Sequence, residues 1–283
     1  MTEGTETVVR HRDSAGHVTT GTLLEILPGW KQGVEQEERW LFVTPHDDDP
    51  AVAAAMLLGW GADAGAEIRI RVVTDGSMGY TPSVPAGDIV RRRQAETRES
   101  FSILGIDDVQ WYGYPDSTLH LWQGRRAVSV APVAEAPPAP HIVSGYTGLQ
   151  NSITAEIRQF NPSRILLMSA ADYHPDHKVV HQETMISIFH AQGDIWPELG
   201  PPKSGTPWVH EFAAYAPFQS PPDLQINGSP ELFARKLAAI EAFRSQTQIQ
   251  KLVENVRDGG AREYARSFPF RTYDPREYGE LFG

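Results

Sequence analysis

The chain has no cysteine among its 283 residues, and this absence narrows the chemistry that it can perform. Without thiols there are no disulfides, no thiolate metal ligands and no cysteine nucleophile. Any metal that the protein binds must therefore be held by histidine nitrogens and carboxylate oxygens.

Basic stripes and long apolar runs are also missing. The formal net charge is −11 at pH 7, so we expect neither nucleic acid nor an anionic membrane surface as a partner. No stretch approaches the roughly 18 apolar residues of a membrane span. Because Met1 to Arg12 is polar, we expect no signal peptide and a cytoplasmic protein.

Three common site motifs are absent as well. The first predicted strand is not followed by Gly-x-Gly-x-x-Gly, and the chain has neither a Walker-type loop nor a Gly-x-Ser-x-Gly turn. Dinucleotide binding, P-loop phosphate chemistry and the serine hydrolase mechanism are therefore disfavoured.

The sequence does contain alternating strand and helix patterns and enough apolar residues, 40% of the chain, for a full core. Strands are predicted at about 41–44, 67–74, 109–114 and 164–169, and helices at about 49–58, 89–105, 149–160 and 179–189. This order predicts an α/β fold with a doubly wound, mostly parallel sheet flanked by helices, as one domain over 1–283.

Two segments do not fit the alternation. Residues 1–38 form an extension in which Val8 to Thr20 is predicted to be an edge hairpin. Leu121 to Tyr146 is too rich in proline for a regular element and is predicted to be an inserted loop. This loop and the segment Trp196 to Trp208 either form walls over the carboxyl edge of the sheet or are plain packed loops.

Acidic and imidazole side chains gather after two of the predicted strands. The run from Pro45 to Asp49 follows the first strand, and the run from Asp172 to His177 follows the fourth. Parallel strands bring their carboxyl ends to one edge of the sheet, where ligands bind in open α/β folds. We therefore expect the two runs to form one site.

A metal ion explains this pairing. Catalytic zinc takes three nitrogen or oxygen ligands from protein and leaves one position for water. His46, Asp49 and His177 can supply these ligands, while Asp48 is free to act as a base on the water, whose pKa the metal lowers toward about 7. His174 can then stabilise an oxyanion or protonate a leaving amine.

Each run also has a simpler interpretation. Asp47 to Asp49 ahead of a helix is typical of a helix N-terminus, where carboxylates bind free N–H groups. His174 to His177 alone is as typical of a turn with solvated histidines. We expect His181 to be packed or to contact a ligand residue. The histidines without acidic neighbours in ligand spacing are interpreted as structural: His120, His141, His190 and His210.

These residues also carry a resemblance to a known family. Val43 to Asp49 resembles the His-Pro-Asp-Asp signature of the LmbE-like, or PIG-L, metal-dependent de-N-acetylases, and His174 to His177 resembles their second motif. Val73 to Gly76, Arg93 to Glu96 and Lys236 to Gln246 are similar to three further segments of that family. The resemblance implies a Rossmann-like fold with inserted loops over the carboxyl edge.

Carried over position by position, the resemblance implies one Zn²⁺ per chain, with Fe²⁺ as the alternative metal. It implies that the metal ligands are His46, Asp49 and His177, that the general base is Asp48, that the transition-state-stabilising or acidic histidine is His174, and that its orienting partner is Asp176.

Three positions bear on the substrate or depart from the family pattern. Arg93 matches an arginine that relatives place near the substrate, although it can equally be a surface arginine of its helix. Asp116 is expected either to hold a sugar hydroxyl or to cap a turn. Asp47 stands where the family usually has proline, so its carboxylate either disturbs the pKa of the base or points to solvent.

The expected function is hydrolysis of an amide, with removal of an acyl group, most simply acetyl, from an N-acyl amino sugar or a sugar-bearing small molecule. Natural-product or thiol metabolism is the expected setting, and a mycothiol-conjugate-type amidase is an alternative within the same chemistry. Two other classes remain open: a non-catalytic metal- or ligand-binding protein, and a phosphoesterase, which usually needs two metals. A homo-oligomer is compatible with the sequence.

Overall fold

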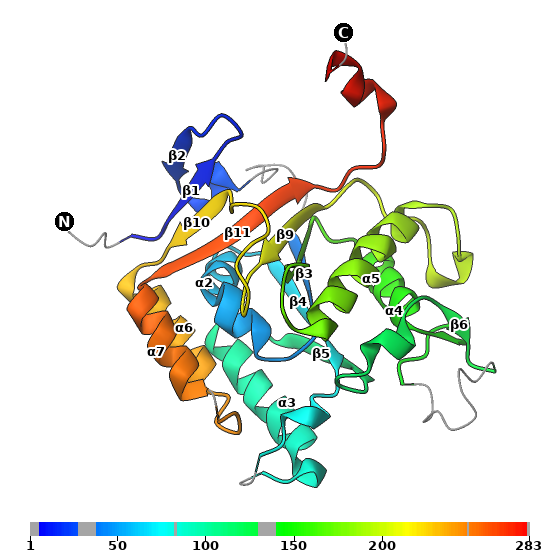
Figure 1. The fold of residues 1–283 in the computed structure, drawn as a ribbon, viewed down its shortest axis with the longest axis horizontal. Helices are drawn as coiled ribbons and strands as arrows, with labels where there is room; N and C mark the ends of the chain where they lie inside the picture. The colour runs from blue at the N-terminus through cyan, green and yellow to red at the C-terminus, as the bar shows by residue number, and fades with distance from the viewer. Residues whose placement is uncertain (1–5, 28–37, 82–83, 130–139, 248, 282–283) are drawn as a thin grey trace.

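The computed structural model describes residues 6–27, 38–81, 84–129, 140–247 and 249–281. A nine-stranded mixed sheet with the strand order β2-β1-β10-β11-β9-β8-β3-β4-β5 runs through its centre, and helices cover both faces (Figure 1). Its strands are β1 (Val8–Arg12), β2 (Val18–Gly21), β3 (Arg39–Thr44), β4 (Glu67–Thr74), β5 (Asp108–Tyr114), β8 (Arg164–Met168), β9 (Trp208–Phe212), β10 (Leu224–Asn227) and β11 (Arg262–Pro269).

The helices follow the predicted alternation between the parallel strands. The α-helices are α1 (Leu23–Ile26), α2 (Asp49–Asp63), α3 (Ala86–Ile103), α4 (Leu149–Phe160), α5 (Pro175–Gln192), α6 (Pro230–Glu241) and α7 (Ile249–Gly259). The short elements are the 3₁₀ turns η1 (Ser77–Gly79), η2 (Leu119–Trp122), η3 (Pro197–Leu199) and η4 (Pro275–Leu281), and the two-stranded β6 (Arg126–Ala127) with β7 (Tyr146–Thr147).

The central strand β3 shows how the sequence builds the core. Successive side chains of a strand point to opposite faces of the sheet. Trp40 and Phe42 pack with residues of α2, α3 and α6 on one face, whereas Leu41 and Val43 pack with residues of α4 and α5 on the other. An unbroken apolar run is therefore what a strand buried on both faces requires.

The carboxyl ends of β3 and β8 meet at the point where the order of the sheet reverses. Strand β3 pairs in parallel with β4 on one side and with β8 on the other. The chain runs from β3 outward through β4 to β5 and then returns to β8. This is the topological switch point at which open α/β sheets bind ligands. It brings the loops after the first and fourth predicted strands together, as expected.

The sheet is half antiparallel, because strands from both ends of the chain extend it beyond β9. Strands β9, β11, β10, β1 and β2 pair antiparallel in that order. Strands β1 and β2 form a hairpin at the edge of the sheet, whereas β9, β10 and β11 were not predicted. One reason is that β11 buries the charged Glu263, which pairs with Lys236 at 2.8 Å and so interrupts the apolar alternation.

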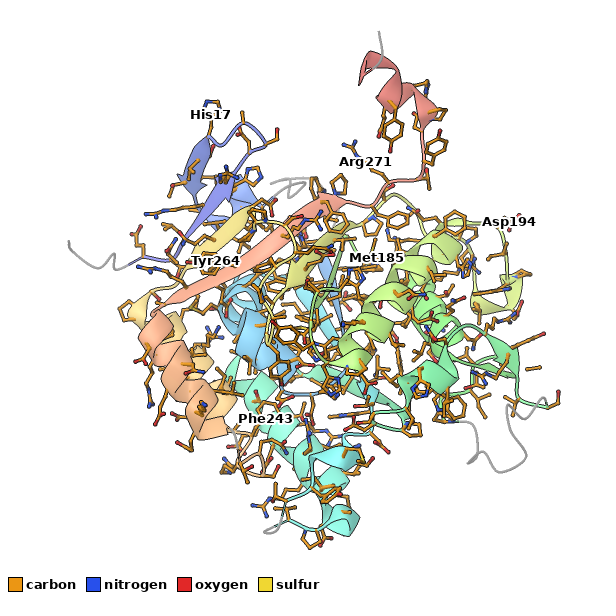
Figure 2. The ribbon with its side chains drawn as sticks, in the orientation of Figure 1. His17, Met185, Asp194, Phe243, Tyr264 and Arg271 are labelled. Atoms are coloured by element: carbon orange, nitrogen blue, oxygen red, sulfur yellow. The ribbon has the colours of Figure 1, made fainter. Side chains whose placement is uncertain are left out.

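The segment from Trp196 to Trp208 does not lie over the carboxyl edge of the sheet. For this segment, the first of the two predicted alternatives is therefore wrong, and it is a packed loop. It follows the last turn of α5, about 27 Å of helix away from the first turn; Asp194, just before it, marks this end in Figure 2. Arg158 of α4 fixes the loop and the end of α5 by donating to six backbone carbonyls, those of His190, Ala191, Gly193, Ile195, Trp196 and Gly200.

The inserted loop is only partly described, because residues 130–139 lie outside the described ranges. Of its two terminal aromatics, Trp122 is buried against Tyr114, with ring centroids 5.6 Å apart, and Tyr146 stacks on the guanidinium of Arg125. Both therefore pack within the protein. Within the described parts of the chain, no helix has the length and apolar character needed to cross a membrane.

Candidate metal centre and active site

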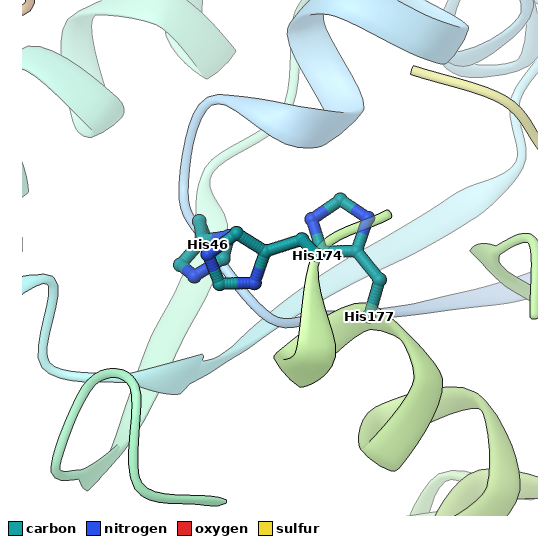
Figure 3. A group of neighbouring side chains, drawn as sticks. All are labelled: His46, His174 and His177. Carbon is teal, nitrogen blue, oxygen red and sulfur yellow. The ribbon is translucent and has the colours of Figure 1, made fainter. Parts of the chain in front are cut away.

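Three histidines from the two predicted runs meet at the switch point. His46 lies in the loop after β3, and His174 and His177 lie at the start of α5 (Figure 3). The ring centroid of His46 is 4.6 Å from that of His174 and 5.4 Å from that of His177. The geometry thus joins residues that are more than 120 positions apart in the chain.

Asp49 lies between two of these histidines. Its Oδ2 atom is 3.3 Å from His46 Nδ1 and 3.2 Å from His177 Nε2. Its other oxygen, Oδ1, is buried and has no hydrogen-bond partner among the described residues. Neither nitrogen of the fully buried His177 makes a hydrogen bond of good geometry with them. Buried polar groups are normally hydrogen-bonded. Two imidazoles and a carboxylate arranged in this way fit the donor set of a divalent metal site.

Two groups of side chains among the described residues have their candidate ligand atoms within 4.8 Å of one another, and neither group contains Asp49. One consists of His46, His174 and His177, and the other of His46, Asp116 and Asp176. In the first group, Nδ1 of His174 already accepts a hydrogen bond from the backbone N–H of Asp176 at 3.2 Å. That nitrogen is therefore occupied, whereas Oδ1 of Asp49 has no partner.

Each of the two histidines beside Asp49 has a second carboxylate on its outer nitrogen. Asp116 Oδ1 is 3.4 Å from His46 Nε2, and Asp172 Oδ2 is 3.2 Å from His177 Nδ1. Metal-ligating histidines usually have such a partner, which fixes the ring and raises its basicity. Asp172 was not singled out from the sequence. The only feature of the sequence that could have indicated its role is its position two residues before His174.

The aspartates after β3 do not act as helix caps. Asp48 is the N-cap residue of α2, and its side chain makes no capping hydrogen bond. Asp49 lies inside the first turn and instead accepts a hydrogen bond from the backbone N–H of His46 at 3.1 Å. The helix-capping interpretation therefore does not account for these carboxylates.

Asp47 is buried and paired, so it does not point to solvent. Its carboxylate accepts hydrogen bonds from the guanidinium of Arg93 and, at 2.9 Å, from the hydroxyl of Thr97. The same guanidinium lies 3.4 Å from Asp48. Arg93 is only 4% exposed, so these contacts favour a role in positioning Asp48 over contact with a substrate.

His174 and its expected orienting partner Asp176 are in contact through a backbone N–H group. His174 is the N-cap residue of α5, where its ring accepts from the backbone N–H of Asp176. The Asp176 carboxylate instead accepts from the backbone N–H of Ser117 at 2.9 Å and lies 3.7 Å from His46 Nε2. Because Nδ1 of His174 is an acceptor, the neutral ring carries its proton on Nε2.

Burial and charge shift the pKa values of the site in opposite directions. Burial raises the pKa of Asp48 to about 6, although the Arg93 guanidinium opposes the shift. For His177, burial lowers the pKa, but the carboxylates of Asp49 and Asp172 outweigh it and raise the pKa to about 9. Burial lowers the pKa of His174, and the other two imidazoles lower it further. A carboxylate with a pKa near neutrality suits a general base.

Known proteins resemble this chain both in sequence and in fold. The family model described as PIG-L: GlcNAc-PI de-N-acetylase matches residues 41–188, which include both runs. A probable N-acetyl-alpha-D-glucosaminyl L-malate deacetylase 2 from Bacillus cereus is 28% identical over 220 residues, 75% of this chain and 85% of the relative. The 1D-myo-inositol 2-acetamido-2-deoxy-alpha-D-glucopyranoside deacetylase from Kineococcus radiotolerans is 27% identical over 57% of this chain and 47% of the relative.

A solved structure shares the fold. The N,N'-diacetylchitobiose deacetylase from Pyrococcus horikoshii has a TM-score of 0.65 to this chain at 19% sequence identity, and the match covers 92% of this chain and 95% of the other. This likeness covers more of the chain than the family match, which spans residues 41–188.

Proposed function

Because the chain belongs to the PIG-L family of de-N-acetylases, we propose that it is a zinc-dependent deacetylase of an N-acetylglucosamine-containing small molecule. The relatives from Bacillus cereus and Kineococcus radiotolerans are named for such substrates. The reaction would add water across the acetamide and release acetate and a free amine.

The main observation that supports this proposal is the position of Asp49 between His46 and His177. Its carboxylate lies within 3.3 Å of one nitrogen of His46 and of His177, and a further carboxylate lies on the outer nitrogen of each ring. His46, Asp49 and His177 would hold the metal, with Fe²⁺ as the alternative to Zn²⁺. When bound, the metal would lower the pKa of water and polarise the acetyl carbonyl.

The remaining chemistry belongs to side chains of this chain. Asp48 would take the proton of the attacking water as the new carbon–oxygen bond forms. His174 would donate a hydrogen bond from Nε2 to the carbonyl oxygen as negative charge develops there. The carbon–nitrogen bond then breaks, and the protonated Asp48 returns its proton to the leaving amine. These reaction steps consume one water molecule for each acetate and amine that they form.

Neighbouring groups would keep the base in place. The Arg93 guanidinium holds Asp47 and lies 3.4 Å from Asp48. The extra carboxylate at position 47 is thus balanced by a buried cation instead of adding uncompensated charge to the site. For this reason the Asp47 substitution does not favour the non-catalytic alternative.

Metal content and amine release on one sample test the proposal. We expect about one zinc per chain and chelator-sensitive release of amine from N-acetylglucosamine glycosides. Zinc without release from any glycoside would argue for a binding protein. Two metals per chain, with the second on the group of His46, Asp116 and Asp176, would favour the phosphoesterase.

Zinc binding is expected to release protons. At pH 7 the metal-free protein holds a proton on His177, whose pKa is about 9, and on His46, whose pKa is raised by Asp116 and other carboxylates despite the opposing effect of burial. Both imidazoles must lose that proton to bind metal, so about two protons should leave per zinc and affinity should rise from pH 6 to 9. Calorimetry in two buffers of different ionisation enthalpy measures the release, and a value near zero would contradict this assignment.

A further inference from the structure

Exposed apolar side chains lie in loops at the edge of the sheet that carries the polar metal centre. Met78 is 54% exposed, Tyr173 is 73% exposed and Tyr215 is 43% exposed. Each follows the carboxyl end of a parallel strand, namely β4, β8 and β9. Since the carboxyl ends of parallel strands lie at one edge of the sheet, these three side chains, hereafter the apolar rim, occupy the edge that carries the site.

Backbone hydrogen bonds tie the apolar rim to the residues that hold the histidines. The N–H of Met78 donates to Asp116 Oδ2 at 3.3 Å, and the N–H of Tyr215 donates to Asp172 Oδ2 at 3.3 Å. The ring of Tyr215 also lies 5.5 Å from that of His177. Tyr173 directly precedes His174 in the chain. Every member of the rim therefore either contacts a residue of the metal centre or lies next to one in the chain.

The loops that carry the rim, residues 75–85, 169–174 and 213–222, contain neither Lys nor Arg. The loop after β5 carries Arg125, whose guanidinium pairs with Glu198 and stacks on Tyr146. The nearby Arg93 is buried and bound to Asp47. Anionic groups are normally held by Arg, by Lys or by helix N-termini. The helix N-termini at this edge, those of α2 and α5, already carry the carboxylates of Asp49 and Asp176, which would repel a further anion.

We propose that the apolar rim is the subsite for the part of the substrate attached to the amino sugar, and that this aglycone is neutral and apolar or aromatic. The inference rests on the proposed deacetylase function and specifies its substrate class. An aromatic aglycone would stack on Tyr215 or Tyr173, with the acetamide toward His46 and His177. This class differs from the L-malate in the name of the Bacillus cereus relative, because malate carries two carboxylates.

The test compares aglycones on the zinc-loaded full chain. Amine release is measured with the phenyl and methyl glycosides of N-acetylglucosamine and with N-acetylglucosamine 1-phosphate. We expect kcat/KM to be about tenfold higher for the phenyl than for the methyl glycoside, mainly through KM, and lowest for the phosphate. Tyr215→Ala and the more exposed Tyr173→Ala should each reduce the phenyl-to-methyl ratio. The control Tyr273→Ala, at a 79% exposed tyrosine of the C-terminal segment, should preserve it.

A binding measurement separates failure of the subsite from failure of the proposed function. Calorimetry with phenyl and methyl glucosaminide, the deacetylated products, should give about tenfold tighter binding for the phenyl compound. Equal binding of the two, or a preference for the 1-phosphate in the kinetic assay, would overturn the apolar subsite and leave the deacetylase intact. Tighter phenyl binding without amine release from any glycoside would support the subsite and overturn the deacetylase.

Discussion

Replacing Asp48 with asparagine is expected to lower kcat for amine release by about a thousandfold while the protein keeps its metal. General base catalysis contributes roughly 10²–10⁴-fold, and asparagine has the shape of aspartate but cannot take the proton from water. Asp48 is buried, with a pKa that burial raises to about 6. It is Asp49, and not Asp48, that lies between His46 and His177, so metal binding should survive the change.

The measurement pairs kcat at saturating substrate with zinc content per chain. Asp258→Asn is a matched control, since Asp258 is an exposed aspartate on α7, away from the site; its kcat should not change. Retention of more than about a tenth of the activity in the Asp48 variant would mean that another group takes the proton. Loss of zinc in that variant would instead make Asp48 a ligand and return the choice of base to the other carboxylates of the site.

The meeting of the expected ligands and base at one edge of the sheet could be predicted, because it depends on short-range patterns. An apolar run of four residues defines the buried end of β3, and Asp49-Pro50 defines the first turn of α2. The same holds for β8 and the start of α5. One general rule, that parallel strands bring their carboxyl ends to a common edge, is then enough to bring the two runs together. The roles assigned to these residues stay predictions until they are tested.

Most of the supporting contacts could not be predicted, because they depend on packing between distant segments. The contact of Asp116 with His46 requires β5 to lie beside β4 and has no local signature. For the same reason, no sequence pattern indicates that the carboxylate at position 47 is paired with a guanidinium 46 residues away. The contact of Asp172 with His177, five residues further along the chain, instead depends on the local bend between β8 and α5.

Long-range pairing also explains why some strands were not predicted. Strands β3, β4, β5 and β8 were found because each is a continuous or alternating apolar run joined to a helix. Strand β11 buries the charged Glu263, whose carboxylate accepts hydrogen bonds from the backbone N–H groups of Met56 and Leu57 in α2. A charged residue that is buried because it binds a neighbouring helix interrupts the apolar-polar alternation by which a strand is recognised. Such a strand can be recognised only in the folded protein.

Replacing His177 with alanine is expected to remove both metal and activity. His177 is fully buried, with one nitrogen 3.2 Å from Asp49 Oδ2 and the other 3.2 Å from Asp172 Oδ2. Its loss leaves only two of the three proposed ligands and deprives two buried carboxylates of their shared partner. We expect less than about a tenth of a zinc per chain after dialysis and an activity loss of at least a thousandfold. Zinc content and kcat/KM on the same preparation test both expectations.

Two further variants show whether the loss arises at the metal itself. His181→Ala removes a histidine one helical turn further along α5 that contacts Glu211 at 2.7 Å, and it should retain zinc. Asp172→Asn keeps His177 but weakens the contact at its outer nitrogen, and it should reduce zinc affinity by about 10–100-fold without abolishing binding. If His177 is a ligand supported by Asp172, zinc binding should be full in His181→Ala, weakened in Asp172→Asn and lost in His177→Ala. Full zinc occupancy in His177→Ala would exclude His177 as a ligand and would favour the neighbouring group of His46, Asp116 and Asp176 as the metal site.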